Sequence, residues 1–299
     1  MFETSTRRWT VRELMRVAIE HLQQRGVDES RLSVELLLAD ALKCPRIRLY
    51  TNFDVPVTAA ELGTFRTLMQ RRLHGEPVQY IVGSTHFMGL EFRVDPRTLI
   101  PRPETETLVE AVIMWANDRQ EERPPSLIDI GTGCGNIAVS SAKLVRRLQA
   151  VAVDISEPAL DVARSNVQLH GVGDHVACRV WDIYSDPPAD VLGRFDAVVS
   201  NPPYIALVEW EGLQREVRDH EPQRALTDGG DGYRALRRII DIGPSLLRNG
   251  GPVMLEVGDG QAEEIIRVMR RAGYENVIAK PDLQGTYRVV SGTIVRRNG

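Results

Sequence analysis

The chain has 299 residues, a formal net charge of -4, 42% hydrophobic residues and 26% charged residues, a balance typical of a soluble globular protein. Its length predicts one large domain with a smaller one, while the acidic balance argues against general nucleic-acid binding and the three scattered cysteines argue against a zinc site. Because no apolar stretch is long enough for a membrane span or a secretion signal, we expect a cytoplasmic protein.

Residues 1–75 are predicted to form a small helical bundle, which we interpret as a domain that docks the substrate. A first helix is expected from Thr10, a second over residues 29–43 and a third from Thr58 to Gly75. Each threonine is followed three residues later by a glutamate, which is the spacing of a capping box. Apolar residues recur at helical spacing in each segment, a pattern typical of faces buried in a core.

Residues 76–106 are predicted to link two domains through a β-hairpin. Two short β-rich runs, at 79–82 and 90–94, are separated by a turn that contains glycine. The segment Ile-Pro-Arg-Pro-Glu-Thr-Glu follows at 100–106, and its prolines oppose regular structure until a helix begins at about Thr105.

Residues 107–299 alternate short apolar strands with helices. Strands are expected at 127–129, 150–154, 176–181, 195–200, 252–257, 276–280 and 287–295, with helices from Asn136 and over 157–170. This alternation predicts an α/β fold, with a seven-stranded, mostly parallel sheet and helices on both faces.

A glycine-rich loop follows the first of these strands. Its candidate cofactor-binding residues are Asp129, Gly131, Thr132, Gly133, Cys134 and Gly135. Glycines let backbone N–H groups approach a ligand closely at the start of a helix. The dinucleotide fingerprint G-x-G-x-x-G is missed, because Asn136 stands where its last glycine would be. The acidic Asp129 would repel a pyrophosphate, but it suits an ammonium group such as that of the methionine part of S-adenosylmethionine.

Two more carboxylates end the next two strands. Asp154 can accept hydrogen bonds from both hydroxyls of a ribose, or it can cap the following helix. Asp182 can accept a hydrogen bond from an adenine amino group while Ile183 packs on the ring. The alternatives for this pair are a turn carboxylate and a buried aliphatic side chain.

The run Asn201-Pro202-Pro203-Tyr204 follows the strand at 195–200, so it opens on the same edge of the sheet as the glycine-rich loop. The Asn201 side chain and the Pro202 carbonyl can accept the two hydrogens of a planar –NH2 group, and the prolines add no competing N–H donors. Both hydrogen bonds would draw electron density onto the nitrogen and direct its lone pair at a methyl donor, while Tyr204 packs on the flat group. The alternative is a Pro-Pro turn with no catalytic role.

These motifs resemble the class I S-adenosylmethionine-dependent methyltransferases, whose fold is Rossmann-like. The NPPY run is shared by adenine-N6 DNA enzymes, guanine-N2 RNA enzymes and protein-glutamine enzymes. Further motifs resemble the peptide chain release factor glutamine methyltransferases, the HemK/PrmC family: Ile100–Glu106, Glu221-Pro-x-x-Ala-Leu226, Asp231-Gly232, Leu255-Glu256-Val257-Gly258 with Gln261, and Asp282-Leu-x-Gly285 with Arg288. The resemblance spans nearly the whole chain.

The resemblance implies transfer of a methyl group from S-adenosylmethionine to the amide nitrogen (N5) of the glutamine in the Gly-Gly-Gln motif of class 1 release factors, leaving S-adenosylhomocysteine. It implies that the glycine-rich loop, Asp154, Ile183 and Asn201 contact the cofactor. It further implies that Asn201, Pro202, Pro203 and Tyr204 hold the glutamine, with Asn201, Pro202 and Tyr204 as the catalytic residues. Family members can have an aromatic residue at position 183, so Trp181 or Tyr184 is an alternative for packing on adenine.

Other functions stay open at this point. A nucleic-acid base methyltransferase would present a flipped amino group to the same acceptors. A ribosomal-protein glutamine methyltransferase shares NPPY but departs from the segment at 100–106. We expect release factors as partners, no membrane or direct nucleic-acid contact, and a monomer. Residues whose roles the sequence leaves undecided are Arg102, Glu104, Glu106, Glu256 and Asp282, with a wall of the active site and a salt-bridged helix start as the alternatives for the first three.

Overall fold

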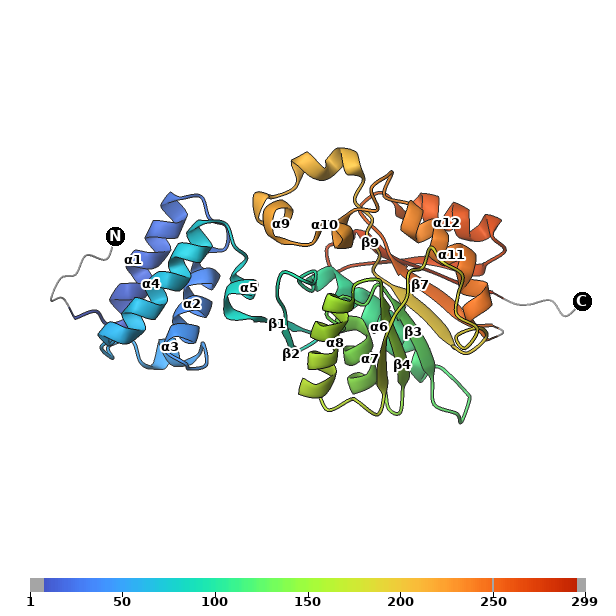
Figure 1. The fold of residues 1–299 in the computed structure, drawn as a ribbon, viewed down its shortest axis with the longest axis horizontal. Coiled ribbons are helices and arrows are strands. Elements are labelled where there is room, and N and C mark those ends of the chain that lie inside the picture. Colours follow the sequence, from blue (N-terminus) through green and yellow to red (C-terminus); the bar gives the residue numbers. More distant parts are fainter. Residues whose placement is uncertain (1–7, 249, 295–299) are drawn as a thin grey trace, which may run out of the picture. The chain divides into compact units, whose positions relative to one another are not determined.

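The computed structural model describes residues 8–248 and 250–294 and divides the chain into two compact units (Figure 1). The first unit contains the chain up to Ser84 together with Gln214–His220, and the second contains Thr85–Leu213 and the chain from Glu221 onward. Within the described residues, no helix is both long and apolar enough to cross a membrane.

The first unit is helical, as predicted. Its helices are α1 (Val11–Gln24), α2 (Ser30–Ala41), α3 (Arg48–Thr51), α4 (Ala59–Leu73), α5 (Val78–Val82) and α9 (Arg215–His220). The capping boxes predicted at Thr10 and Thr58 are both present. Leu14, Leu37 and Phe65 come from α1, α2 and α4 and are fully buried in one core, so the predicted helical bundle is confirmed.

The predicted strand at 79–82 is wrong, because the chain forms the short helix α5 there. Pro77 precedes this helix, and Gly83 ends it with a φ of 77°, a left-handed conformation that glycine adopts without strain. A short apolar run can be buried in a helix or in a strand, so periodicity alone could not decide. The hairpin instead pairs β1 (Ser84–Phe87) with β2 (Leu90–Arg93), and all of it except Ser84 falls in the second unit.

A seven-stranded sheet forms the centre of the second unit. Its strands are β3 (Ser126–Ile130), β4 (Gln149–Asp154), β5 (Val176–Val180), β6 (Ala197–Ser200), β7 (Pro252–Glu256), β8 (Glu275–Pro281) and β9 (Tyr287–Thr293). The order is β5-β4-β3-β6-β7-β9-β8; the first five strands run parallel, and β9 runs antiparallel to both of its neighbours. The predicted seven-stranded, mostly parallel sheet is confirmed. Val295, the predicted end of the last strand, lies outside the described residues.

Helices cover both faces of the sheet, which gives this unit three layers (Figure 1). The core on one face includes residues of α6 (Glu106–Asn117), α7 (Asn136–Leu144) and α8 (Glu157–Leu169), and the core on the other includes α11 (Arg234–Leu246) and α12 (Ala262–Arg271). Along β6, successive residues alternate between these two cores. Because both faces are buried, its four residues are buried and the strand reads as a continuous apolar run until Ser200.

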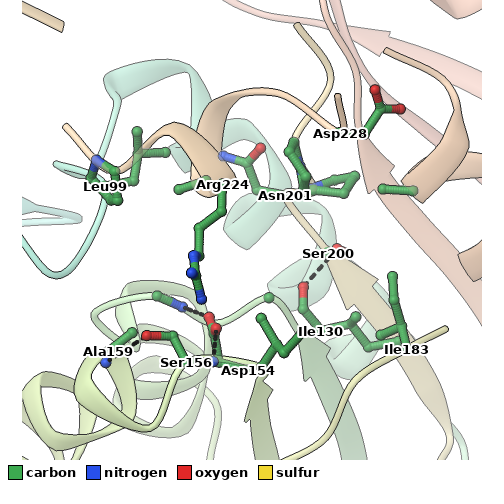
Figure 2. A pocket seen from close by; sticks show the side chains of 18 of the residues that line it. Leu99, Ile130, Asp154, Ser156, Ala159, Ile183, Ser200, Asn201, Arg224 and Asp228 are labelled. Carbon is green, nitrogen blue, oxygen red and sulfur yellow. Dashed lines mark hydrogen bonds between the residues drawn. The ribbon is translucent and has the colours of Figure 1, made fainter. Parts of the chain in front are cut away.

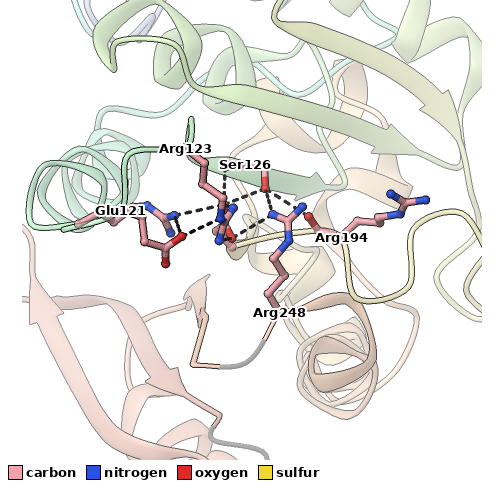
Figure 3. Close-up of polar contacts among 7 residues, drawn as sticks. Glu121, Arg123, Ser126, Arg194 and Arg248 are labelled. Carbon is pink, nitrogen blue, oxygen red and sulfur yellow. Dashed lines mark hydrogen bonds and ion pairs between the residues drawn. The ribbon is translucent and has the colours of Figure 1, made fainter.

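A cluster of arginines around Asp196 closes the amino edge of the sheet (Figure 3). Asp196 lies just before β6 and is 3% exposed. Its carboxylate accepts hydrogen bonds from the Ser126 backbone (2.9 Å), from Arg248 (3.0 Å) and from Arg123. Burial by itself would raise the pKa of Asp196, but these donors outweigh it and lower the pKa to about 2. The cluster therefore ties the starts of β3, β6 and β7 together.

Candidate functional site

A cavity of about 430 Å³ lies at the carboxyl edge of the sheet (Figure 2). Its wall includes Ile130 at the end of β3 with Gly131 after it, Asp154 at the end of β4, and Ser200 at the end of β6 with Asn201 after it. The direction of strand order reverses between β3 and β6, and ligands of open parallel sheets bind at such a switch point. The Ser200 hydroxyl donates to the Ile130 carbonyl (2.6 Å), which joins the two strand ends that flank this point.

Two glycines of the predicted loop line the cavity, Gly131 and Gly133. Both have positive φ, 71° and 56°, a conformation that side-chain-bearing residues rarely adopt. The Gly131 N–H donates to the Val153 carbonyl (2.8 Å), and the Gly133 N–H donates to Asp154 Oδ2 (3.0 Å). The loop is therefore fastened to the end of the neighbouring strand β4.

The other predicted residues of this loop, namely Asp129, Thr132, Cys134 and Gly135, do not line the cavity. Asp129 is fully buried, and its Oδ2 accepts hydrogen bonds from the Thr132 hydroxyl (2.6 Å) and the Ala138 N–H (3.2 Å). Burial raises the pKa of Asp129 to about 7. Its Oδ1 has no hydrogen-bond partner within the described part of the chain. These residues therefore stabilise the loop on its side away from the cavity. Their contact with a ligand stays a prediction.

The Asp154 carboxylate is held in place by two backbone donors. Besides Gly133, the Ser156 N–H donates to Asp154 Oδ1 (2.9 Å), and burial raises the Asp154 pKa. Ser156, not Asp154, caps α8, because its hydroxyl accepts a hydrogen bond from Ala159 (3.3 Å). Each carboxylate oxygen keeps a free lone pair for a further donor. Figure 2 shows Arg224 of α10 (Gln223–Leu226) pointing toward this carboxylate across the cavity.

The residues after β5 form another part of the wall. Asp182, Ile183 and Trp181 all line the cavity. The Ile183 backbone is fixed by Arg238, whose Nε donates to the Ile183 carbonyl (2.7 Å). The buried indole N–H of Trp181 has no hydrogen-bond partner among the residues that the structure describes. Tyr184 also borders the cavity, and its ring lies 4.4 Å from the Arg234 guanidinium.

The NPPY loop brings Asn201, Pro202 and Pro203 to the cavity wall. Asn201 Nδ2 donates a hydrogen bond to the Thr105 hydroxyl (3.0 Å), and no described residue donates to Asn201 Oδ1. The amide is thus anchored through its nitrogen, which leaves its oxygen as a free acceptor. Tyr204 lies behind the wall and packs against the core of the β-sheet.

Three residues that are far from Tyr204 in the sequence support its backbone in the fold. Gln261 Nε2 donates to the Tyr204 carbonyl (3.0 Å), while Gln261 Oε1 accepts from the Gly258 N–H (2.9 Å). Gly232 has a φ of 78°, and a Cβ there would lie only 2.3 Å from the Tyr204 carbonyl oxygen. The motifs that contain Gly232, Gly258 and Gln261 therefore support the backbone of the NPPY loop.

The segment at 100–106 is joined to the same region. The carboxylate of Glu221 accepts a hydrogen bond from the Ile100 N–H (3.1 Å) and forms an ion pair with Arg102. Glu106 Oε1 accepts a hydrogen bond from the Met88 N–H (2.6 Å), which fastens the β1–β2 turn to α6. Structural contacts are therefore found for Arg102 and Glu106, two of the residues that the sequence left undecided.

Glu256 ends β7 and is 1% exposed. Its Oε1 accepts a hydrogen bond from the Tyr204 hydroxyl (3.3 Å). Burial raises the pKa of Glu256 to about 7, although the neighbouring Thr105, Tyr204 and Arg288 favour the charged form. Arg288 in turn donates to Asp282 (3.1 Å). The two undecided acidic residues therefore both have structural partners: Glu256 contacts Tyr204, and Asp282 contacts Arg288.

Two family models match the chain: the PrmC N-terminal domain over residues 13–83 and the methyltransferase small domain over residues 114–231. A release factor glutamine methyltransferase from Geobacter sulfurreducens is 40% identical over 288 residues, which cover 96% of this chain and 97% of the relative. One from Chlorobaculum tepidum is 43% identical and covers 85% of this chain and 88% of its own. The chain belongs to the release factor glutamine methyltransferase family.

The comparison with solved structures informs only about the fold of the chain. A methyltransferase from Pyrococcus furiosus superposes with a TM-score of 0.50 at 17% identity, over 77% of this chain and 98% of its own. Together with the seven-stranded sheet described above, this match confirms the predicted Rossmann-like fold.

Sequence reasoning missed several residues at the site of this family member. Thr105 contacts Asn201 although 96 positions separate them, and Arg224 and Leu99 line the cavity. A threonine inside Pro-Glu-Thr-Glu reads as part of a helix start, so its local pattern gives no sign of a distant partner. Only the fold brings η1 (Pro103–Thr105) against the end of β6.

Proposed function

We propose that this chain transfers a methyl group from S-adenosylmethionine to the side-chain amide nitrogen (N5) of a glutamine, leaving S-adenosylhomocysteine. The proposed substrates are release factors, which the names of the curated relatives specify. Within them we propose the Gly-Gly-Gln motif of class 1 factors, which the family resemblance implies. The observation that carries the proposal is that the acceptor loop Asn201–Pro203 and the loop glycines Gly131 and Gly133 line one cavity.

The cavity fits the proposed cofactor in size and chemistry. About 430 Å³ lies within the usual range for a small-molecule pocket. Asp154 would accept hydrogen bonds from the ribose hydroxyls, since both of its oxygens keep a lone pair after binding the backbone. Asp182 and Ile183, which line the cavity, would meet the adenine. Gly131 and Gly133 would admit the methionine part.

Bound S-adenosylmethionine would supply an electrophilic methyl group. The chain would orient the nucleophile: Asn201 Oδ1 and the Pro202 carbonyl accept the two hydrogens of the glutamine amide, whose lone pair is otherwise delocalised. Two fixed acceptors stabilise the nitrogen as it gains positive character, and they limit the approach to one face. The nitrogen would lose one of its two protons after the transfer, which leaves a neutral N-methyl amide. Tyr204, anchored by Gln261 and Glu256, keeps the loop that carries these acceptors in shape.

We also propose that the N-terminal unit docks the release factor, that the enzyme is a monomer, and that it works in the cytoplasm. The match of residues 13–83 to the PrmC N-terminal domain supports the docking role, because it gives the chain a separate helical unit beside the methyltransferase unit. Reaction with release factors truncated outside the Gly-Gly-Gln domain would test it: KM should rise when the docked region is removed, while kcat stays similar.

The decisive experiment incubates the protein with methyl-labelled S-adenosylmethionine and a class 1 release factor, then maps the label by mass spectrometry. The expected result is one methyl group on the glutamine of Gly-Gly-Gln and none on a factor in which that glutamine is replaced by alanine. Parallel reactions with ribosomal RNA, DNA and ribosomal proteins should stay unlabelled. Label on a nucleic-acid base with an unlabelled release factor would overturn the proposal.

A further inference from the structure

One part of the cavity wall is formed by the segment at 221–227, which carries the Glu-Pro-x-x-Ala-Leu motif. Its residues on the wall are Pro222, Arg224, Ala225 and Thr227. The segment is fixed at both ends. At its start, the Glu221 carboxylate accepts a hydrogen bond from the Ile100 N–H (3.1 Å). Near its end, the Leu226 carbonyl accepts one from the Ile205 N–H (2.9 Å). The backbone of this part of the wall is therefore held in position.

Arg224 brings an uncommitted guanidinium group to this wall. Figure 2 shows its side chain crossing the cavity toward the Asp154 carboxylate. Among the residues that the structure describes, the Arg224 side chain forms neither a hydrogen bond nor an ion pair. A second arginine on the wall, Arg97, is already bound, because its Nε and Nη2 donate to the Asp95 carboxylate (2.9 and 2.6 Å). Arg224 therefore keeps its N–H donors for a molecule in the cavity.

The charge of Arg224 complements that of Asp154. Burial raises the pKa of Asp154, and the positive charge of Arg224 acts against burial by favouring the carboxylate. No ion pair joins the two side chains within the described part of the chain, so neither group blocks the other. A ligand that binds to the Asp154 carboxylate would also lie within reach of the guanidinium.

A ribose diol suits this pair of groups. Each hydroxyl has one hydrogen to donate and lone pairs that can accept. When both hydrogens are donated to a carboxylate, the two oxygens are left as acceptors. A guanidinium offers N–H donors in a planar fork and has no acceptor that would compete for the hydroxyl hydrogens. A carboxylate and a guanidinium together therefore satisfy both the donors and the acceptors of the diol.

We propose that Arg224 is a cofactor-binding residue that donates hydrogen bonds to the ribose oxygens of S-adenosylmethionine while Asp154 accepts from the ribose hydroxyls. This inference rests on the proposed cofactor. It gives a role to a residue at an unspecified position of the motif at 221–226. It also makes the ribose a point of recognition that is read from two sides of the cavity.

Calorimetric titration with S-adenosylhomocysteine measures binding without any methyl transfer. We expect Arg224→Gln to weaken its affinity by about 5- to 50-fold, the effect of losing charge-assisted hydrogen bonds. Arg224→Lys keeps the charge but loses the planar fork, so it should recover only part of this loss. Arg97→Gln is the matched control, because the guanidinium that it removes is bound to Asp95, and it should change the affinity by about twofold or less.

The 2′,3′-dideoxy analogue of S-adenosylhomocysteine separates contact with the ribose from other effects of Arg224. Wild type should bind this analogue more weakly than S-adenosylhomocysteine, because both hydroxyls are missing. Arg224→Gln should leave the affinity for the analogue nearly unchanged, so the preference for the intact ribose should shrink in the variant. An equal loss for both ligands, an unchanged affinity for S-adenosylhomocysteine, or full recovery in Arg224→Lys would overturn the proposal.

The same titrations keep this inference distinct from the proposed function. If wild type does not bind S-adenosylhomocysteine, the proposed cofactor fails and the role of Arg224 fails with it. If wild type binds it and methylates a release factor, while Arg224→Gln binds it equally well, only the role of Arg224 fails. Because Arg224 is exposed, its variants should keep the wild-type midpoint of thermal unfolding, which distinguishes lost affinity from a lost fold.

Discussion

Replacing Asp196 by asparagine should destabilise the protein, because it removes the charge that holds the amino edge of the sheet together. Asp196→Asn keeps the shape of the side chain but removes the carboxylate that pairs with Arg123 and Arg248, and Arg123 then keeps only its pair with Glu121. The Asp196 pKa is lowered from 3.8 to about 2. At about 1.4 kcal/mol per pKa unit this corresponds to about 2.5 kcal/mol.

That value is an upper bound, because the side chains of Arg123 and Arg248 are each 40% exposed and water screens the attraction. We therefore expect the free energy of unfolding to fall by about 1–2.5 kcal/mol at neutral pH. The folded-state pKa is depressed, so the stabilisation is present above 3.8 and is lost as the pH falls through about 2. The difference between wild type and variant should shrink accordingly in acid.

Urea unfolding followed by circular dichroism, at a series of pH values from neutral to acid, measures this difference directly. Asp190→Asn is the matched control: Asp190 also pairs with an arginine, Arg179 (2.7 Å), but both side chains are largely exposed, at 59% and 42%. Its substitution should change the unfolding free energy much less. Equal losses in the two variants, or a loss in Asp196→Asn that does not depend on pH, would refute the argument from buried charge.

Three further predictions concern the cavity. Asn201→Ala should reduce kcat by about 100-fold or more while cofactor affinity in calorimetry stays nearly unchanged, and equal losses in both would contradict the acceptor role. Asp154→Ala should weaken cofactor binding by about 10- to 100-fold with a smaller effect on saturated turnover, and an unchanged dissociation constant would count against the ribose contact. Gly232→Ala should impair methyl transfer far more than Gly229→Ala, because both glycines have positive φ (78° and 74°) but only the Cβ at 232 would meet the Tyr204 carbonyl oxygen; equal activities would exclude that support.

The parts of the site that could be predicted are those in which function lies in a contiguous run of residues. The strand–glycine loop–helix pattern predicted the turn that contains Gly131 and Gly133, and the structure places both at the cavity. The NPPY run predicted an acceptor loop at the carboxyl edge, because parallel strands all end on one side of a sheet. Each of these loops directly follows a strand in the sequence, so its place along the chain was enough to predict the edge of the sheet at which it lies.

Prediction failed where one sequence fits two local structures. The run at 79–82 is apolar and β-rich, yet it forms the helix α5, since Gly83 closes a helical turn there and tertiary contacts bury Val78, Tyr80 and Ile81. Asp154 and Ser156 could each have capped α8, and only the backbone geometry assigned that role to Ser156.

The sequence by itself determined the kind of chemistry: an acceptor loop for a planar –NH2, a glycine-rich cofactor loop, and motifs that identify the family. Only the tertiary structure decided how those parts are held. Thr105, Glu256 and Gln261 stand far apart in the chain, and what each does depends on which lone pair or proton it presents to a neighbour in space. The amino-acid sequence determines which donor and acceptor groups are present. Which donor meets which acceptor depends on their positions in space, and these are determined only when the sheet and its covering helices have folded.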